Sequence, residues 1–191
     1  MSGNVALLPN GRVAVGREDG SIDIWGPFSR SRVGRLMGHS AQVYALAVLA
    51  DGRLVSGSED MTVRVWSVGR RVELACWSDH EGGVVALCVM PDGRLASSAS
   101  DHSIRLWDTQ LGKVERSFER YCHHEDCAVA WLLGGVIAGS TEKSELLQWD
   151  TSSGRLLAAF KIPNHIAAMT TLPQGRLVIG DYTDVQLFDP K

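Results

Sequence analysis

A period of 41 residues runs through this chain and constrains its fold more than any other feature. Gly-Arg pairs begin at Gly11, Gly52, Gly93 and Gly175, at intervals of 41, 41 and twice 41 residues. A second marker keeps nearly the same interval, with steps of 41, 41, 42 and 39 residues between the aromatic rings of Trp25, Trp66, Trp107, Trp149 and Phe188. Two independent markers with one shared period indicate a repeated structural unit of a kind that stacks on its neighbours.

Each repeat is composed of short strand-like segments separated by turn residues. In the second repeat, 43–49 is an almost continuous apolar run, and Asp51-Gly52 then supplies a hairpin turn. Residues 53–58, 62–66 and 72–77 are three further segments of strand length, and 62–66 alternates polar with apolar side chains. Four antiparallel strands per repeat of this length predict an all-β fold, a β-propeller of four-stranded antiparallel blades.

The repeats divide the chain into about five blades within one domain, 1–191. Their bounds fall near 1–37, 38–78, 79–120, 121–162 and 163–191, and the fifth ends before an outer strand. An open or partial propeller is therefore expected. Because a propeller removes exposed strand edges by pairing its ends, self-association or a strand from a partner would complete the ring.

The composition restricts the classes of function. A hydrophobic fraction of 45% with a net charge of -3 is typical of a folded globular domain. The small negative charge argues against nucleic acid held by a general basic field, and no apolar run is long enough to span a bilayer. The first residues lack the features of a secretory signal, and the four cysteines form no disulfide framework, so we expect a cytoplasmic or nuclear protein.

The second and third repeats share an ordered set of residues. The second contains Gly38-His39, Asp51-Gly52, Ser56-Gly57-Ser58, Asp60 and Trp66-Ser67. The third contains Asp79-His80, Asp92-Gly93, Ser97, Asp101 and Trp107-Asp108. This pattern resembles the WD-repeat β-propeller family, and the resemblance extends over nearly the whole chain. It implies a module that binds other macromolecules and catalyses nothing.

The resemblance also implies a hydrogen-bonded group of His, Ser, Asp and Trp inside a blade. Carried over by position, the two groups are His39, Ser56, Asp60 and Trp66, and His80, Ser97, Asp101 and Trp107. A Ser, His and Asp together also invite a catalytic-triad interpretation. The set recurs one period later, however, which favours a structural role, since buried polar groups need partners. The first and fourth repeats depart from the pattern, with Val15 and Ala138 at the serine position.

A separate cluster, Cys122-His123-His124-Glu125-Asp126-Cys127, contains residue types that bind zinc. Its spacing matches no standard zinc module, and no second half-site occurs elsewhere. We therefore expect neither a metal nor a cofactor.

The loops of a propeller are held by a rigid scaffold, so their sequences can vary without unfolding the domain. We therefore expect the contacts with partners in these loops. By position in the family pattern, the candidates are Glu18, Gln42, Tyr44, Glu59, Gly83, Val85, Ser100, His102 and Tyr182. Tyr44 is the best single anchor, because an amphipathic ring interrupts an apolar strand near its loop end.

The leading function is a protein–protein interaction scaffold or recognition module within a larger complex. One alternative is the substrate-receptor module of a ubiquitin-ligase-type assembly. Another is a nucleic-acid or phospholipid reader, which would need arginines gathered on one face. A propeller enzyme would need unrepeated titratable residues that converge at the channel, and the sequence offers none.

Overall fold

The computed structural model describes residues 4–28, 31–119, 128–141, 143–163, 166–172, 175–181 and 183–188. They form five antiparallel sheets, each contiguous in sequence, so every sheet is one blade. Blade 1 contains β1 (Val5–Leu7), β2 (Val13–Gly16), β3 (Ile22–Trp25) and β4 (Arg32–Leu36). Blade 2 contains β5 (Val43–Val48), β6 (Leu54–Ser58), β7 (Val63–Ser67) and β8 (Val72–Trp77).

The remaining blades follow the same order. Blade 3 contains β9 (Val84–Val89), β10 (Leu95–Ala99), β11 (Ser103–Asp108) and β12 (Lys113–Glu119). Blade 4 contains β13 (Val129–Leu132), β14 (Val136–Ser140), β15 (Glu145–Asp150) and β16 (Leu156–Lys161). Blade 5 contains three strands, β17 (Ala168–Thr171), β18 (Leu177–Gly180) and β19 (Val185–Phe188).

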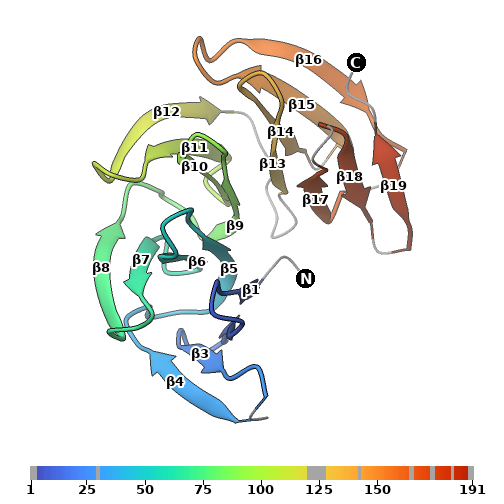
Figure 1. Cartoon of the computed structure of the whole chain (residues 1–191). Helices are drawn as coiled ribbons and strands as arrows, with labels where there is room; N and C mark the ends of the chain where they lie inside the picture. The colour runs from blue at the N-terminus through green and yellow to red at the C-terminus, as the bar shows by residue number, and fades with distance from the viewer. Residues whose placement is uncertain are drawn as a thin grey trace.

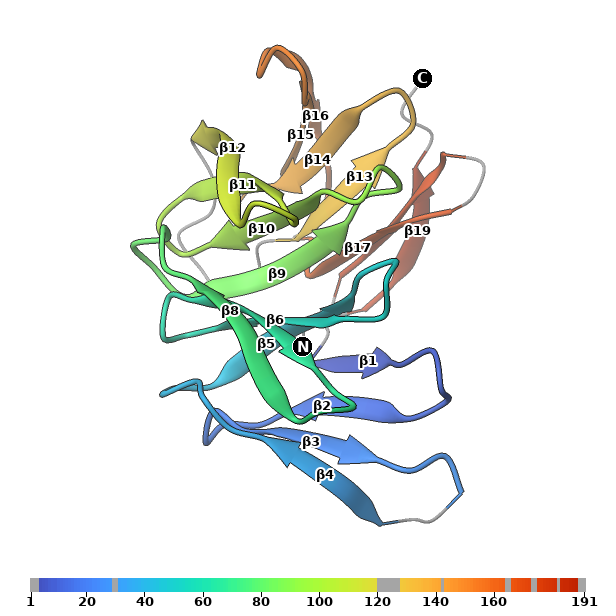
Figure 2. The same cartoon turned by 60° about the vertical axis from the view of Figure 1, so that its left-hand side comes forward.

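The blades are arranged as an arc around a common centre (Figure 1). The first strands β1, β5, β9, β13 and β17 lie towards the middle, and β4, β8, β12 and β16 lie at the periphery. Each first strand contacts the first strand of the next blade. Blades 1 and 5 stand on either side of an opening in the arc, and the sheets fan out in sequence order when viewed from the side (Figure 2).

The predicted fold class is confirmed. The chain is all-β, with five antiparallel blades, the last of which has three strands. The strands of blade 2 begin or end within a residue of the predicted segments. The first strand stops at Val48 because the amide of Leu49 donates instead to the carbonyl of Arg53, within the turn that contains Gly52 at φ +86°.

The hydrophobic core consists of layers between consecutive blades, one for each pair. The layer between blades 1 and 2 contains Ile22, Ile24 and Leu36 against Leu46 and Trp66. Corresponding positions form the layers between blades 2 and 3, 3 and 4, and 4 and 5. Each blade therefore depends on its neighbour to cover its apolar face, as in other repeat architectures.

No segment of the described residues is a helix of the length and apolar character needed to cross a membrane.

A candidate protein-interaction surface

A buried chain of hydrogen bonds connects the second and third strands of blade 2, β6 and β7, to the loop before the blade and to the turn between these strands. The indole Nε1 of Trp66 donates to Ser56 Oγ at 2.7 Å. Ser56 Oγ lies 2.6 Å from His39 Nε2, and His39 Nδ1 lies 2.8 Å from Asp60 Oδ2. The structure thus brings together the four side chains that the family resemblance grouped.

The donors in this chain determine the protonation state of the histidine. Ser56 accepts from the indole, so its single hydroxyl proton is free to donate to His39 Nε2, while His39 Nδ1–H donates to Asp60. Burial of His39 disfavours the charged imidazolium and outweighs the bond to Asp60, so the pKa of His39 lies below its usual value. The imidazole is therefore neutral at neutral pH.

Blade 3 repeats the arrangement one period later. Trp107 Nε1 donates to Ser97 Oγ at 2.8 Å, and His80 bridges Ser97 and Asp101 at 2.7 and 2.8 Å. Burial opposes ionisation of Asp101, but hydrogen bonds from His80 and Ser103 outweigh it and hold the pKa of Asp101 well below its usual value. The repetition at equal geometry supports a structural role for both groups.

The aspartate of each group fixes the turn that precedes the third strand. Asp60 accepts hydrogen bonds from the backbone and hydroxyl of Thr62 and from the amide of Ser40. Burial opposes ionisation of Asp60, but these bonds keep its pKa below the usual value. The side chain of Glu59, which directly precedes this clamped aspartate, is exposed. The network thus presents a carboxylate on a rigid turn.

The turns and loops at this edge are joined to one another by backbone hydrogen bonds. The amide of Glu59 donates to Gln42, that of Ser100 donates to Gly83, and that of Val43 donates across blades to Arg17. We call the set of turns 17–21, 59–62 and 100–102, with loops 37–42 and 78–83, the turn-edge rim. It is a continuous surface over blades 1 to 3.

The residue after the turn aspartate has a left-handed backbone conformation in all three rim turns. It is Gly20 at φ 79° in blade 1, Met61 at φ 68° in blade 2 and His102 at φ 66° in blade 3, and Ser144 at φ 55° occupies the corresponding turn of blade 4, outside the rim. A side chain in this region is strained by about 1–2 kcal/mol, and such strain is typical of functional positions. Blades 2 to 4 therefore keep side chains where glycine would fit more easily.

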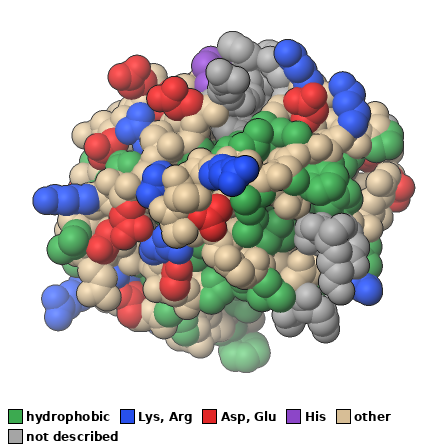
Figure 3. Space-filling view, turned by 90° about the horizontal axis from the view of Figure 1, so that it is seen from above, with side chains coloured by type: hydrophobic (Ala, Val, Ile, Leu, Met, Phe, Trp, Pro, Cys, Tyr) green, Lys and Arg blue, Asp and Glu red, His purple; other side chains and the backbone are tan. Residues whose placement is uncertain are grey.

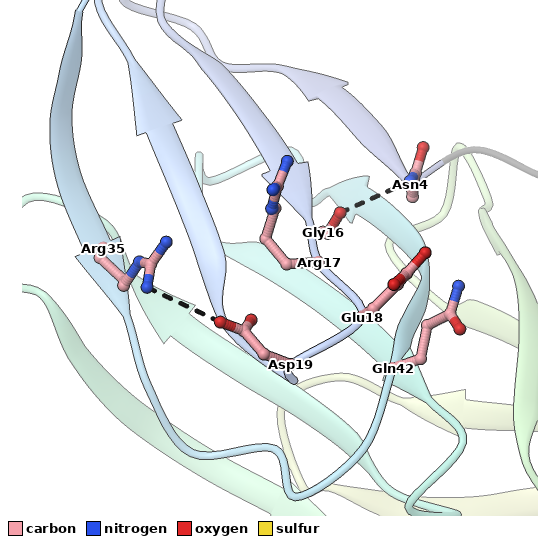
Figure 4. Close-up of a pocket in the computed structure, with 7 residues that line it drawn as sticks. All are labelled: Asn4, Gly16, Arg17, Glu18, Asp19, Arg35 and Gln42. Atoms are coloured by element: carbon pink, nitrogen blue, oxygen red, sulfur yellow. Dashed lines mark hydrogen bonds and ion pairs between the residues drawn. The ribbon is translucent and has the colours of Figure 1, made fainter.

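A pocket of about 550 Å³ opens at the blade 1 end of the rim. Its lining residues are Asn4, Gly16, Arg17, Glu18, Asp19, Arg35 and Gln42. Arg35 and Asp19 form an ion pair of 3.7 Å at one end, and Glu18 and Gln42 line the other (Figure 4). Charged and amide side chains dominate the lining, which suits a polar segment of a partner better than an apolar small molecule.

Beneath this pocket, a buried aspartate gathers three arginines. Asp23 accepts from Arg35 Nε at 2.7 Å and from Arg32 at 3.2 Å, and Arg17 lies 3.9 Å away. The hydrogen bond from Arg35 is the main reason that the pKa of Asp23 is lowered. This cluster holds the Arg35 side chain at the pocket and replaces the histidine network that blade 1 lacks.

The predicted contact residues occupy different environments. Glu18 and Glu59 are exposed, and Gln42, Gly83, Ser100 and His102 are partly exposed on the turn-edge rim. Tyr44 sits at a β-bulge between β5 and β6 and packs against the core cluster of blades 3 and 4. Val85 occupies the equivalent bulge in blade 3 but is 1% exposed within that cluster, so its side chain contributes to the core and offers no contact surface. Tyr182, like the segment Cys122 to Cys127, lies outside the described residues.

The sequence interpretation did not identify the arginine cluster or the pocket above it. One signal was available: Asp23 occupies the position of Arg64 and Arg105 in the next two repeats. A change of charge sign at a repeated position indicates that the charged partners there differ from those in the other blades. In the tertiary structure, Asp23 draws three arginines together at the surface of blade 1.

Two repeats match the family model described as WD domain, G-beta repeat, over residues 30–67 and 71–108. The matched segments contain Trp66 and Trp107, and each segment ends one residue after its tryptophan. The chain contains WD repeats. The third strand of each matched WD repeat lies in blade 2 or blade 3, where the complete polar networks occur.

Comparison with solved structures agrees. The WD40 β-propeller domain of Doa1 superposes with a TM-score of 0.78 and 25% sequence identity, over 95% of this chain. The match covers 61% of that domain, so this WD-repeat chain spans less than two thirds of it. No curated protein sequence matches the chain significantly. Since 1503 chains of solved structures are similar, the fold by itself selects no particular partner.

Proposed function

We propose that this WD-repeat chain is a non-catalytic interaction scaffold whose turn-edge rim binds a basic segment of a partner protein. The WD-repeat propeller fold generally serves as a protein-interaction scaffold. The observation that carries the specific proposal is the pair Glu18 and Glu59. Both are exposed at equivalent turns of adjacent blades, and neither forms an ion pair within the described part of the chain.

The surroundings of the two glutamates support a peptide ligand. Gln42 lies between them in the rim and offers amide donors and acceptors, and Tyr44 follows it at the bulge. The turns themselves are pre-organised by the buried networks, so little conformational entropy is lost when a partner binds. A lysine or arginine side chain with an apolar stem fits this combination of carboxylate and aromatic groups.

A protein partner is favoured over nucleic acid by the state of the arginines at the opposite edge of the blades. Arg53 and Arg94, which belong to the repeated Gly-Arg turns, form ion pairs of 2.7 and 2.6 Å with Asp51 and Asp92. Their charge is therefore balanced locally, which weakens any field that would attract phosphates. We place the protein in the cytoplasm or nucleus as part of this proposal.

The test is selection of a random dodecapeptide phage library on the immobilised chain, followed by binding measurements with selected peptides. We expect peptides enriched in lysine and arginine, and at least about tenfold weaker binding to the double variant Glu18→Gln, Glu59→Gln. Glu115→Gln is the matched control, because Glu115 is half-exposed and paired with Arg94 at the opposite edge. Peptides without basic residues, or equal binding to the double variant, would reject the proposal.

A further inference from the structure

Blade 1 carries charged side chains at positions that are not charged, or not charged in the same sense, in blades 2 and 3. Arg17 occupies the position of Ser58 and Ala99, both of which are fully buried. Asp23 stands where the next two repeats have an arginine, and Arg35, its neighbour on the outer strand, stands where they have a cysteine and a serine. Departures from a repeated pattern that meet in space point to a function specific to that blade.

The arginines around Asp23 leave one positive charge without a full partner. Asp23 accepts two hydrogen bonds from Arg35, at 2.7 and 3.2 Å, and one from Arg32 at 3.2 Å. Arg17 Nε lies 3.9 Å from Asp23 Oδ2, which is beyond hydrogen-bond distance. The only other carboxylate in this cluster is Asp19, 3.7 Å from Arg35. Three guanidinium groups thus share two carboxylates, and the remaining charge lies at Arg17, whose side chain is 54% exposed.

The turn at residues 17–21 presents this charge beside a negative one. Arg17 and Glu18 extend from the turn into the pocket, whereas Arg35 and Asp19 pair at its other end (Figure 4). Within the described residues no ion pair joins Arg17 to Glu18. The backbone of Arg17 is fixed, since its amide donates to Ser21 at 2.9 Å and its carbonyl accepts from the first strand of blade 2 at 3.0 Å. Two opposite charges are therefore held next to each other on a rigid turn, and both are open to a ligand.

The pocket favours a carboxylate at Arg17 over a phosphate. A guanidinium group matches the two oxygens of a carboxylate in a bidentate pair. A phosphate monoester carries nearly two negative charges at neutral pH, and the second would lie in the same pocket as Glu18 and Asp19. The side-chain amides of Asn4 and Gln42 also line the pocket and offer partners for a peptide backbone. The lining thus suits a peptide segment with charges of both signs.

Selectivity at this pocket depends on local charges, because the protein has no strong general field. The face shown in Figure 3 carries acidic and basic side chains interspersed with one another. The net charge of the chain is only -3. Long-range attraction therefore discriminates little between acidic and basic ligands.

We propose that Arg17 is a specificity-determining residue of the turn-edge rim, which binds the carboxylate of an Asp or Glu in the partner segment. This inference rests on the proposed function, in which Glu18 binds a basic residue of the same segment. The acidic residue lies within about two positions of that basic residue, since side chains two apart share one face of an extended chain. The rim thereby selects basic segments with an adjacent acid over purely basic ones.

The probes are the tightest-binding dodecapeptide from the phage selection described above and a version in which its acidic residue is replaced by the amide, Gln for Glu or Asn for Asp. Fluorescence anisotropy with the full chain should show at least about tenfold weaker binding of the amide version. Arg17→Gln should weaken binding of the acidic peptide by a similar factor and leave binding of the amide version unchanged. This non-additivity distinguishes a direct charge pair from a structural role of Arg17, which would weaken both peptides.

Two controls accompany these measurements. Arg70→Gln removes the same charge from an exposed turn between β7 and β8, beside the Gly-Arg turn of blade 2, and should alter neither affinity. A third peptide with phosphoserine in place of the acidic residue should bind no more tightly than the acidic peptide.

The outcomes separate this inference from the proposed function. Selected basic peptides without a nearby acid, or equal losses for both peptides with Arg17→Gln, would overturn the inference alone if binding still depends on Glu18 and Glu59. Tighter binding of the phosphoserine peptide would overturn the assignment of a carboxylate. A selection that yields no basic residues would overturn the proposed function and this inference together.

Discussion

The indole of Trp77, on the outer strand of blade 2, stacks on the indole of Trp107 in blade 3, with centroids 5.1 Å apart and planes 19° apart. The same pair of positions meets between later blades as Phe118 with Trp149 and Phe160 with Phe188. The periodic tryptophan therefore has two roles. Its nitrogen closes the polar network within its own blade where a serine is present, and its ring packs against the outer strand of the preceding blade.

Replacement of Trp77 by alanine should destabilise the chain by about 3–5 kcal/mol, because it leaves a cavity between two blades. Trp25→Ala is the control of the same residue type. Trp25 is 36% exposed, against 1% for Trp66, since no blade precedes blade 1 within the described residues. Its loss should cost less than about 2 kcal/mol. Urea unfolding measures both, and equal losses would contradict this packing model.

Ser56→Ala should cost about 2–4 kcal/mol, more than an ordinary polar substitution. The change leaves the buried Nε1–H of Trp66 and Nε2 of His39 without partners, and each unsatisfied group is expensive. Ser78→Ala, at an exposed loop position, should change the free energy of unfolding by less than about 0.5 kcal/mol. If the two variants unfold at the same urea concentration, the network contributes no net stability.

Mild acid should destabilise the protein through His39. Its pKa is lower in the folded chain than in the unfolded chain, so the unfolded state binds more protons as pH falls through about 6.5. Stability is therefore present above that pH and is lost as the pH falls towards the folded pKa. Unfolding free energies between about pH 7.5 and pH 5 should decline more steeply for the wild type than for His39→Gln. Parallel pH profiles would refute the assignment of a neutral buried imidazole.

The positive-φ turns of the rim should respond in opposite ways to substitution. Met61→Gly should raise stability by about 0.5–1 kcal/mol, since relief of backbone strain exceeds the entropic penalty of glycine. Gly20→Ala should lower it by more than about 2 kcal/mol, because a Cβ there would overlap the carbonyl of His39. Thermal unfolding of the two variants checks this, and a stabilised Gly20→Ala would show that the loop can move aside.

Much of this architecture follows from local pattern. The period, the Asp-Gly turns and the alternation in each repeat are enough to predict blades, strand positions and an incomplete fifth blade, because a repeated unit must bury the same face each time. The partners of His39 and His80 are those that the resemblance to the WD-repeat family implies. The family pattern also predicts Val85 at the contact surface, and its burial shows that one repeat position can be partly exposed in one blade, as at Tyr44, and buried in the next.

The arrangement around single charges depends on contacts that no local pattern encodes. Asp23 meets Arg17, Arg32 and Arg35 only because β2, β3 and β4 fold side by side, and the pocket above them needs Gln42 from the next blade. Likewise, Val185 is exposed whereas Ile22 at the same position of blade 1 is buried, because blade 2 covers Ile22 and no further blade covers Val185 within the described residues. The sequence by itself determined the repeated unit, since hydrophobic burial within one unit is local. Only the tertiary structure decided which surfaces remain uncovered, because burial there depends on the neighbouring blade.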